Sequence, residues 1–403
     1  MNRPSQIFKR WHLHGWWCGV MLFVPCLTHA TPYVPKADSE VLETLPNTVA
    51  DTRARDLRTL RQALAEAPEN LTLAVQLARD YVEIGRETGD PRYAGYAQSV
   101  LTPWWNLPDP PDQVLVLRAQ LRQRSHQFEL ALADLDRVLL IDSRAADARL
   151  LRATIRQVIG DYPGATEDCA ALQGLVSAPL VTHCEAIVMS VTGKLQRAYD
   201  LLAQTSRSLS GFDTPTRAWI LTTLAEMAAR LAQPDQAAQH FKEALAIAPS
   251  DQYLLIAYAD FLLDTGHAAE VIALLAPYSR VDGLCLRYTL ALKATGRSTS
   301  EPAAQLRARY AAGAARGETA HQREEARFAL QIEQNPTRAL ELALANWRVQ
   351  KEPPDLRLLI NCAWAKRDDQ ALQIARDWLV ATSYEDRRLD LAQLTAASPS
   401  KNP

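Results

Sequence analysis

The chain has 403 residues, of which 48% are hydrophobic and 22% are charged, as in an ordinary globular protein. Its formal net charge of −2, without a block of basic residues, argues against a nucleic-acid-binding protein. Only 15 glycines are present, and no segment shows a sustained alternation of β-branched and aromatic residues. The composition therefore predicts an all-α protein, built as two domains or as one elongated array.

The segment 1–30 has the order of a secretory signal peptide. Arg3, Lys9 and Arg10 precede an apolar run over 15–27 and small residues ending at Ala30. This order predicts cleavage after Ala30 and export, to the periplasm of a bacterium. The run is shorter than the roughly 20 apolar residues of a membrane-spanning helix, so an uncleaved anchor is the alternative. Cleavage takes the formal charge from −2 to −5, and we expect no stable membrane insertion of the mature chain.

After an extended lead-in over 31–56, one sequence shape recurs with a nearly constant period. The copies are H-Q-F-E-L-A with Ala131, G-D-Y-P-G-A with Ala165 and G-K-L-Q-R-A with Ala198, and the alanines are almost evenly spaced. Matching helical segments, L-V-L-R-A-Q-L-R-Q and R-L-L-R-A-T-I-R-Q, precede the first two copies. A fixed period of this length indicates an array of repeated helix pairs.

The fourth copy carries the fullest pattern. Leu224-Ala225, Ala237, Phe241 and Pro249 stand at the small, aromatic and closing positions of a helix pair. This unit resembles the tetratricopeptide repeat, a helix–turn–helix unit of about 34 residues. The resemblance implies an α-solenoid of about eight or nine stacked hairpins whose first helices line a concave face. We expect the array over 57–299, degenerate hairpins over 300–395 and a disordered tail over 396–403.

Two arginine–aspartate pairs occupy equivalent places in consecutive units. Arg118 is followed by Asp134 in one unit, and Arg152 is followed by Asp168 at the same spacing in the next. Because the two helices of a unit are antiparallel, each pair should meet across its hairpin. The alternative is a repeated clamp for carboxylate or phosphate, but the regular placement favours structural ion pairs. As partly exposed pairs they would contribute about 0–1 kcal/mol each.

Four cysteines follow Ala30. Cys169 and Cys184 are expected on neighbouring antiparallel helices, nearly level, on either side of a turn near 177–179. In an exported protein this placement predicts a disulfide, with two buried free thiols as the alternative. Cys285 and Cys362 are too far apart in sequence to pair within neighbouring units, and we expect both to be free and buried.

Catalytic and metal-binding patterns are missing from the sequence. The histidines are scattered without H-E-x-x-H spacing, and neither a G-x-S-x-G elbow nor a phosphate or dinucleotide loop is present. We therefore expect no enzyme activity, no metal and no cofactor. The tryptophans near the C-terminal end, Trp347, Trp364 and Trp378, are expected in the core.

The resemblance implies that the second, fifth and ninth places of each repeat unit face the concave groove. In the two best-formed central units these places hold Trp219, Thr222 and Glu226, followed by Tyr253, Ile256 and Asp260. Such a stripe could receive a peptide with an apolar side chain beside a basic group. The alternative is that Trp219 and Tyr253 only cover the adjacent helix.

The sequence thus predicts an exported, non-catalytic scaffold that binds a protein or peptide partner through its concave face, and no nucleic acid. The competing hypothesis is an envelope assembly factor or enzyme regulator whose region after residue 300 forms a separate functional module. Whether 300–403 folds alone distinguishes the two.

Overall fold

The computed structural model describes residues 49–206, 212–278, 281–318, 321–389 and 394. The predicted signal peptide, the lead-in as far as residue 48 and the predicted tail lie outside the described residues. The chain divides into two units, Met1–Arg53 and Ala54–Pro403. The description below concerns the second unit alone.

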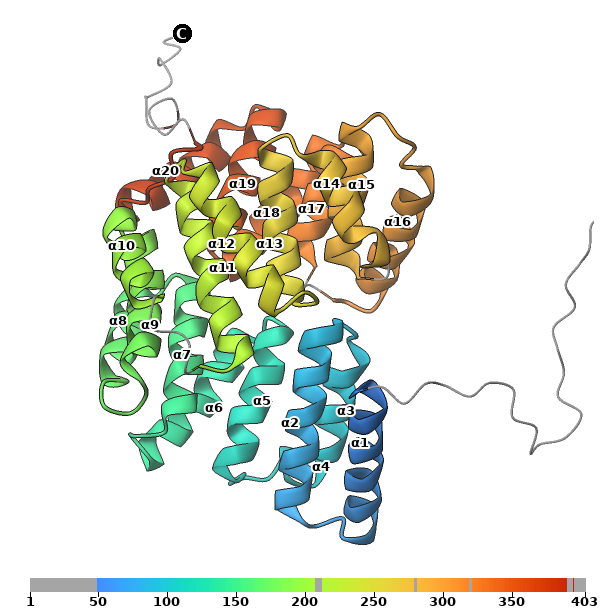
Figure 1. The fold of residues 1–403 in the computed structure, drawn as a ribbon, viewed down its shortest axis with the longest axis vertical. Coiled ribbons are helices and arrows are strands. Elements are labelled where there is room, and N and C mark those ends of the chain that lie inside the picture. Colours follow the sequence, from blue (N-terminus) through green and yellow to red (C-terminus); the bar gives the residue numbers. More distant parts are fainter. Residues whose placement is uncertain (1–48, 207–211, 279–280, 319–320, 390–393, 395–403) are drawn as a thin grey trace, which may run out of the picture. The chain divides into compact units, whose positions relative to one another are not determined.

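The described residues form helices joined by short connections, and no strand occurs among them. Nine antiparallel hairpins follow the leading helix α1 (Val49–Glu66) (Figure 1). They are α2 (Leu71–Thr88) with α3 (Arg92–Val100), α5 (Asp112–Arg124) with α6 (Phe128–Ile141), α7 (Ala146–Ile159) with α8 (Tyr162–Ala171), α9 (Ala178–Val191) with α10 (Leu195–Ser206), α11 (Thr214–Arg230) with α12 (Pro234–Ile247), α13 (Gln252–Asp264) with α14 (Ala268–Leu275), α15 (Asp282–Ala294) with α16 (Ser300–Ala315), α17 (Gln322–Gln331) with α18 (Pro336–Val349), and α19 (Pro353–Lys366) with α20 (Asp369–Thr382). The short α4 (Thr102–Trp105) links the first two hairpins. The all-α solenoid predicted from the repeat period is confirmed.

Local sequence signals fix where the helices begin. The side chains of Asn70, Asp213 and Asp251 each accept a hydrogen bond from a backbone N–H of the following first turn. Such caps satisfy donors that a helix leaves unpaired at its start. The hairpin boundaries are therefore encoded locally, which explains why the period could be read from the sequence.

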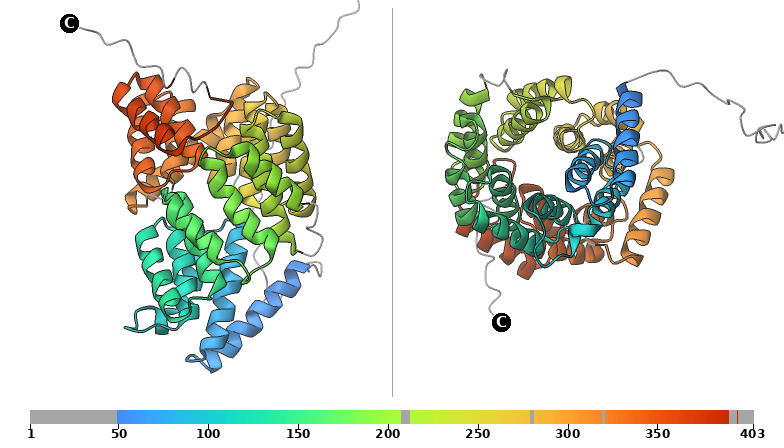
Figure 2. Two further views of the ribbon diagram at one scale, coloured as in Figure 1. Left: turned by 90° about the vertical axis from the view of Figure 1, so that its left-hand side faces the viewer. Right: turned by 90° about the horizontal axis from the view of Figure 1, so that it is seen from below.

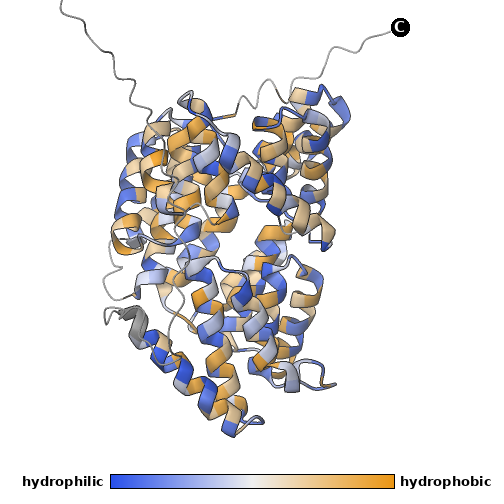
Figure 3. Ribbon diagram, turned by 90° about the vertical axis from the view of Figure 1, so that its right-hand side faces the viewer, coloured by the Kyte–Doolittle hydropathy of each residue, from blue (hydrophilic) through white to orange (hydrophobic). Residues whose placement is uncertain are grey.

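Small and aromatic residues hold each hairpin together. In the hairpin of α11 and α12, Leu224, Ala225, Ala237 and Ala244 are completely buried, and Phe241 is 1% exposed. Alanine lets the two helix backbones approach, and the phenyl ring fills the remaining space. Figure 3 shows polar and apolar residues alternating around the helices, as such amphipathic packing requires.

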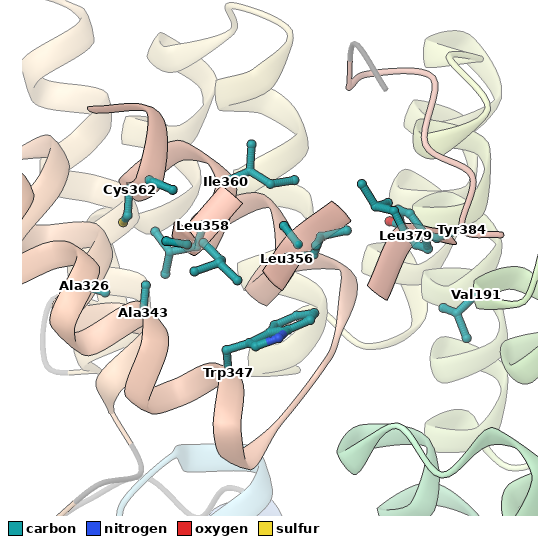
Figure 4. Packing of buried hydrophobic residues seen from close by; sticks show 14 of the residues in the cluster. Val191, Ala326, Ala343, Trp347, Leu356, Leu358, Ile360, Cys362, Leu379 and Tyr384 are labelled. Atoms are coloured by element: carbon teal, nitrogen blue, oxygen red, sulfur yellow. The ribbon is translucent and has the colours of Figure 1, made fainter. Parts of the chain in front are cut away.

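The C-terminal hairpins pack against the central ones rather than extending a linear stack. One buried cluster joins Tyr162, Val188 and Val191 of the central hairpins to residues of α17–α20, among them Trp347 and Leu356. Figure 4 shows the C-terminal part of this cluster, with Val191 from α9 across from it. In the right-hand view of Figure 2 the helices of this unit follow one another around a common axis, so distant hairpins meet.

Hydrogen bonds to backbone carbonyl oxygens also join the segment after α18 to the end of α7. The N–H of Lys351 donates to the carbonyl oxygen of Val158 at 2.7 Å, and the Lys351 ammonium donates to the carbonyl oxygen of Ile159 at 3.2 Å. Gly160 follows with φ +88°, and a Cβ atom there would lie 3.0 Å from the Lys351 side chain. Glycine is suited to both the left-handed conformation and the close approach.

The expectation for the C-terminal tryptophans holds in part. Trp347 is 6% exposed and contacts the partly buried Trp378 edge-to-face. Trp364 is 40% exposed, so its assignment to the core was wrong. It lies near the C-terminal end of α19, on a side of the helix that its neighbours leave open to solvent.

Candidate functional site

The first helices of successive hairpins bring charged side chains together on one side, here called the inner face. Asp260 of α13 accepts hydrogen bonds from Arg287 of α15 and from Arg327 of α17, at 2.8 and 2.5 Å. Arg287 also pairs with Glu324 of α17. Asp264, at the end of α13, receives both terminal nitrogens of Arg357 at 2.6 and 3.0 Å. These bonds connect helices from four hairpins.

Burial and charge act in opposite directions on Asp260. Burial alone would raise the pKa of its carboxyl, but Arg287 and Arg327 hold that pKa well below its usual range. Asp260 is therefore ionised and fully committed to arginines of its own chain. A predicted position on the concave face is thus occupied by internal ion pairs.

Trp219 and Thr222, two further residues of the predicted stripe, take part in packing. The Trp219 ring lies edge-to-face on the buried His183, with the ring centroids 4.1 Å apart. Thr222 is 1% exposed, and its hydroxyl donates to the carbonyl oxygen of Ala218 at 2.8 Å. The Thr222 side chain thus does not reach the surface of the inner face, because the fifth place of this repeat unit turns into the helix interface.

Ile256 lies against the following hairpin. A Cβ atom on Gly283, in the first turn of α15, would stand 3.0 Å from Cδ1 of Ile256. The absence of a side chain at Gly283 therefore lets α15 approach Ile256, which is partly buried.

Glu226 and Tyr253 form the accessible part of the predicted stripe. The Tyr253 hydroxyl lies 3.0 and 2.9 Å from the two carboxylate oxygens of Glu226, to which it donates. Tyr253 is 51% exposed, yet burial among the surrounding helices, with the Glu226 charge, raises the pKa of its phenol well above the usual value. Burial also raises the pKa of Glu226 to about 7, against the opposing effect of the Tyr253 hydrogen bond. The Tyr253 side chain is thus half exposed to solvent, whereas Glu226 beside it is partly buried.

A groove of about 350 Å³ opens on the inner face of the N-terminal hairpins, where sequence reasoning placed no site. It lies between α2 and α5 and reaches the first turn of α7. Its lining residues combine apolar and charged side chains: Arg79, Asp80, Val82, Glu83, Val116, Leu117, Gln120 and Asp147. The position of these residues in the repeat could have indicated the groove. Arg79 and Gln120 each directly follow the small residue of their helix, as Glu226 follows Ala225.

The two arginine–aspartate pairs meet across their hairpins. Arg118 donates to both carboxylate oxygens of Asp134 at 2.9 and 2.6 Å, and Arg152 does the same to Asp168. The side chains of Arg118 and Asp134 are 8% and 4% exposed, so these pairs are more buried than expected. Asp168 also receives Arg149 and Arg156. Both aspartates thus serve internal ion pairs.

Cys169 of α8 and Cys184 of α9 are joined by a disulfide, with their Cα atoms 5.5 Å apart. Cys285 and Cys362 are free and buried. The half-cystines belong to the same buried cluster as the C-terminal hairpins. The disulfide therefore fixes α8 to α9 where the later hairpins pack on them.

Within the described ranges, no group of three or more metal-ligating side chains comes together. None of the helices described is long and apolar enough to cross a bilayer.

One family model matches part of the chain. Residues 228–294 match the family model for the tetratricopeptide repeat. No curated protein sequence matches the chain significantly. Similar solved structures include a tetratricopeptide repeat protein from Parabacteroides merdae (14% identity, TM-score 0.40, covering 64% of this chain and 92% of that one). Another is the human IFIT1 dimer with PPP-AAAA, at 14% identity and a TM-score of 0.40, covering 85% of this chain and 88% of that one. A third is yeast Tom70, at 13% identity and a TM-score of 0.33, covering 86% of this chain and 91% of that one.

The matched segment runs from the end of α11 to the end of α15, and paired helices of the same kind continue on both sides of it. Over residues 228–294 the chain is thus similar to the tetratricopeptide repeat, and its fold is an array of paired helices.

Proposed function

We propose that the chain is an exported, non-catalytic scaffold that binds a partner polypeptide through its inner face. The observation that carries this proposal is the groove on α2, α5 and α7. It offers apolar contact from Val82, Val116 and Leu117 beside acidic groups such as Asp147. Apolar and charged groups that converge in one concavity are characteristic of a binding site.

The charge of the groove indicates the kind of partner. Its lining holds three carboxyl side chains and one guanidinium, that of Arg79, and one of these carboxyls, Glu83, pairs with Arg86 beside the groove, which leaves an acidic excess of one charge. A polypeptide with an aliphatic side chain beside a basic residue complements this lining. The same chemistry was expected for the central stripe, so the groove extends the predicted binding surface toward the N-terminal hairpins.

Export is supported by the signal-peptide pattern and is compatible with the disulfide, since such bonds persist in oxidising compartments. The competing hypothesis of a separate C-terminal module is less well supported. Trp347, Leu356 and Leu379 share their core with α7–α9, which favours one continuous scaffold.

Site-specific photo-crosslinking in the native cell tests the proposal. A photoreactive residue at Gln120, in the groove, should yield a cross-linked partner, whereas one at Lys242, exposed on the outer helix α12, should not. The substitution Asp147→Lys should remove the cross-link by reversing a groove charge. Equal cross-linking from both positions, or a yield unaffected by Asp147→Lys, would contradict the proposal.

A further inference from the structure

Glu226 differs from the acidic side chains around it. Asp260, Asp264, Glu324, Glu352 and Asp355 each pair with an arginine of this chain. Within the described part of the chain, Glu226 has no ion-pair partner, and its carboxylate accepts only the hydroxyl of Tyr253. A carboxylate in an enclosed position is ordinarily paired with a cation, because its isolated charge is costly there.

The arginine side chains that act on Glu226 already contact other groups of the chain. Arg230, one turn later on α11, donates to the carbonyl oxygen and the hydroxyl of Ser190 at 3.0 and 2.7 Å. Its guanidinium also lies over the ring of Tyr384. Arg388 is held by Asp386 at 2.7 Å. Of the described residues, the two arginines that act electrostatically on Glu226 could therefore pair with it only by breaking another contact.

A chain of ion pairs links the groove lining to the helix that carries Tyr253. Glu83, in the groove lining, pairs with Arg86 at 2.7 Å, and Arg86 reaches Asp251 at 2.6 Å. Asp251 caps α13 two positions before Tyr253. Charged contacts thus connect a residue of the groove lining to the first turn of α13, which carries Tyr253.

We propose that Glu226 and Tyr253 form a subsite for the guanidinium group of an arginine side chain of the bound polypeptide. This inference rests on the proposed function and adds the identity of one recognised side chain. A carboxylate accepts two parallel hydrogen bonds from a guanidinium, as Asp264 does from Arg357. The Tyr253 phenol fixes the carboxylate, and its ring can lie against the planar cation.

Proton binding should then compete with arginine binding. The charged and titratable groups acting on Glu226 are Arg230 on its own helix, Tyr253 on α13, Glu352 between α18 and α19, and Arg388 in the C-terminal segment. Burial raises the pKa of Glu226 to about 7, so the carboxyl is mostly ionised at pH 8 and mostly protonated at pH 6. Because only the ionised form attracts the cation, affinity should fall roughly tenfold from pH 8 to pH 6.

The probe is Nα-acetyl-arginine amide, with the Nα-acetyl-citrulline amide as its neutral isostere. Titration of the mature protein, followed by NMR, should show saturable binding of the arginine compound that is much weaker for the citrulline compound. Glu226→Gln should abolish the discrimination and the pH dependence. Glu243→Gln, on an exposed face of α12, is the matched control and should leave both unchanged.

Three results would overturn the inference: equal binding of the two compounds, no binding of either, or an unchanged pH profile in Glu226→Gln. The proposed function is tested separately by the cross-link at Gln120. A protein that retains that cross-link but does not discriminate arginine from citrulline would keep its scaffold function and lose this subsite.

Discussion

The Nη1 atom of Arg327 lies 2.5 Å from Oδ1 of Asp260, although the two are 67 positions apart in the chain. The other carboxylate oxygen of Asp260 accepts from Arg287 at 2.8 Å. One carboxylate thus ties α13 to two later hairpins. The contact explains why a position predicted to face a partner is instead occupied by the chain's own arginines.

Replacing Asp260 by asparagine should destabilise the protein. It leaves Arg287, whose side chain is 4% exposed, without this anionic partner, and breaking a buried pair costs about 3–5 kcal/mol. The depressed pKa of Asp260 stabilises the fold fully above the carboxyl's ordinary pKa, and this contribution is lost as the pH falls toward the folded-state pKa. The loss caused by the substitution should therefore be present at pH 7 and shrink in acid. Chemical denaturation at pH 7 and pH 3 measures both values. Equal effects at the two pH values would contradict the assignment.

The pair of Arg118 and Asp134 should contribute more than a surface pair. Both side chains are buried and joined by two hydrogen bonds, so Arg118→Ala should cost about 3 kcal/mol or more. The matched comparison is Arg316 with Glu318, whose side chains are 62% and 40% exposed, and where removing the arginine should change stability much less, because solvent screens the pair. Double-mutant cycles on both pairs check this. Absence of coupling between Arg118 and Asp134 would refute it.

Removing the disulfide should lower stability without altering the repeat fold. The bond closes a loop between positions 15 residues apart, for which chain entropy gives about 3 kcal/mol. Cys169→Ser with Cys184→Ser should unfold at lower denaturant concentration with unchanged helical content. Peptide mapping under non-reducing conditions should find Cys285 and Cys362 alkylated and the other pair protected. Alkylation of all four thiols in the unfolded chain would show that the bond does not form.

Glu226→Gln should stabilise the protein at pH 8 and have little effect at pH 5. The folded-state pKa of Glu226, about 7, lies above the ordinary value of 4.5 because burial disfavours its charge. Ionisation of Glu226 therefore removes stability as the pH rises between these two values. Thermal melting at both pH values, with Glu243→Gln as control, measures the difference. A variant less stable than the wild type at pH 8 would contradict this reading.

Residues 300–403 expressed alone should not fold cooperatively. Leu356, Leu379 and Trp347 would lose the apolar partners that α7–α9 supply. Circular dichroism with thermal melting should show reduced helicity and no sigmoidal transition. A cooperative transition would restore the hypothesis of a separate C-terminal module.

The hairpins could be predicted because their determinants are local. The alternation of small and aromatic residues around Ala225 and Phe241, and side-chain caps such as Asp213 before α11, act within a single repeat. Register alone also placed Glu226 and Tyr253 on one surface, where they form a hydrogen-bonded pair. The residues that determine the hairpins and this pair lie within about one repeat length of one another in the sequence.

The contacts between distant hairpins could not be predicted, because they depend on how small rotations between successive repeats accumulate. That curvature brings Arg327 to Asp260 and Lys351 to Val158, and no single repeat encodes it. It also leaves the groove open at α2 and α5 while later hairpins occupy the equivalent places on α13. Thr222 illustrates a smaller difference. It is buried, whereas Ile256, at the same fifth place of the next repeat unit, is only partly buried.

The bonds between Lys351 and the end of α7 have a consequence for how the protein folds. In a linear repeat array each unit contacts only its neighbours, so folding can start anywhere and the ends unravel independently. Here residues 192 positions apart must meet, and closing so long a loop slows the search for the native state. We therefore expect the hairpins to unfold together, in a single thermal transition, rather than one by one from the ends. The last hairpins stabilise the middle ones through these contacts.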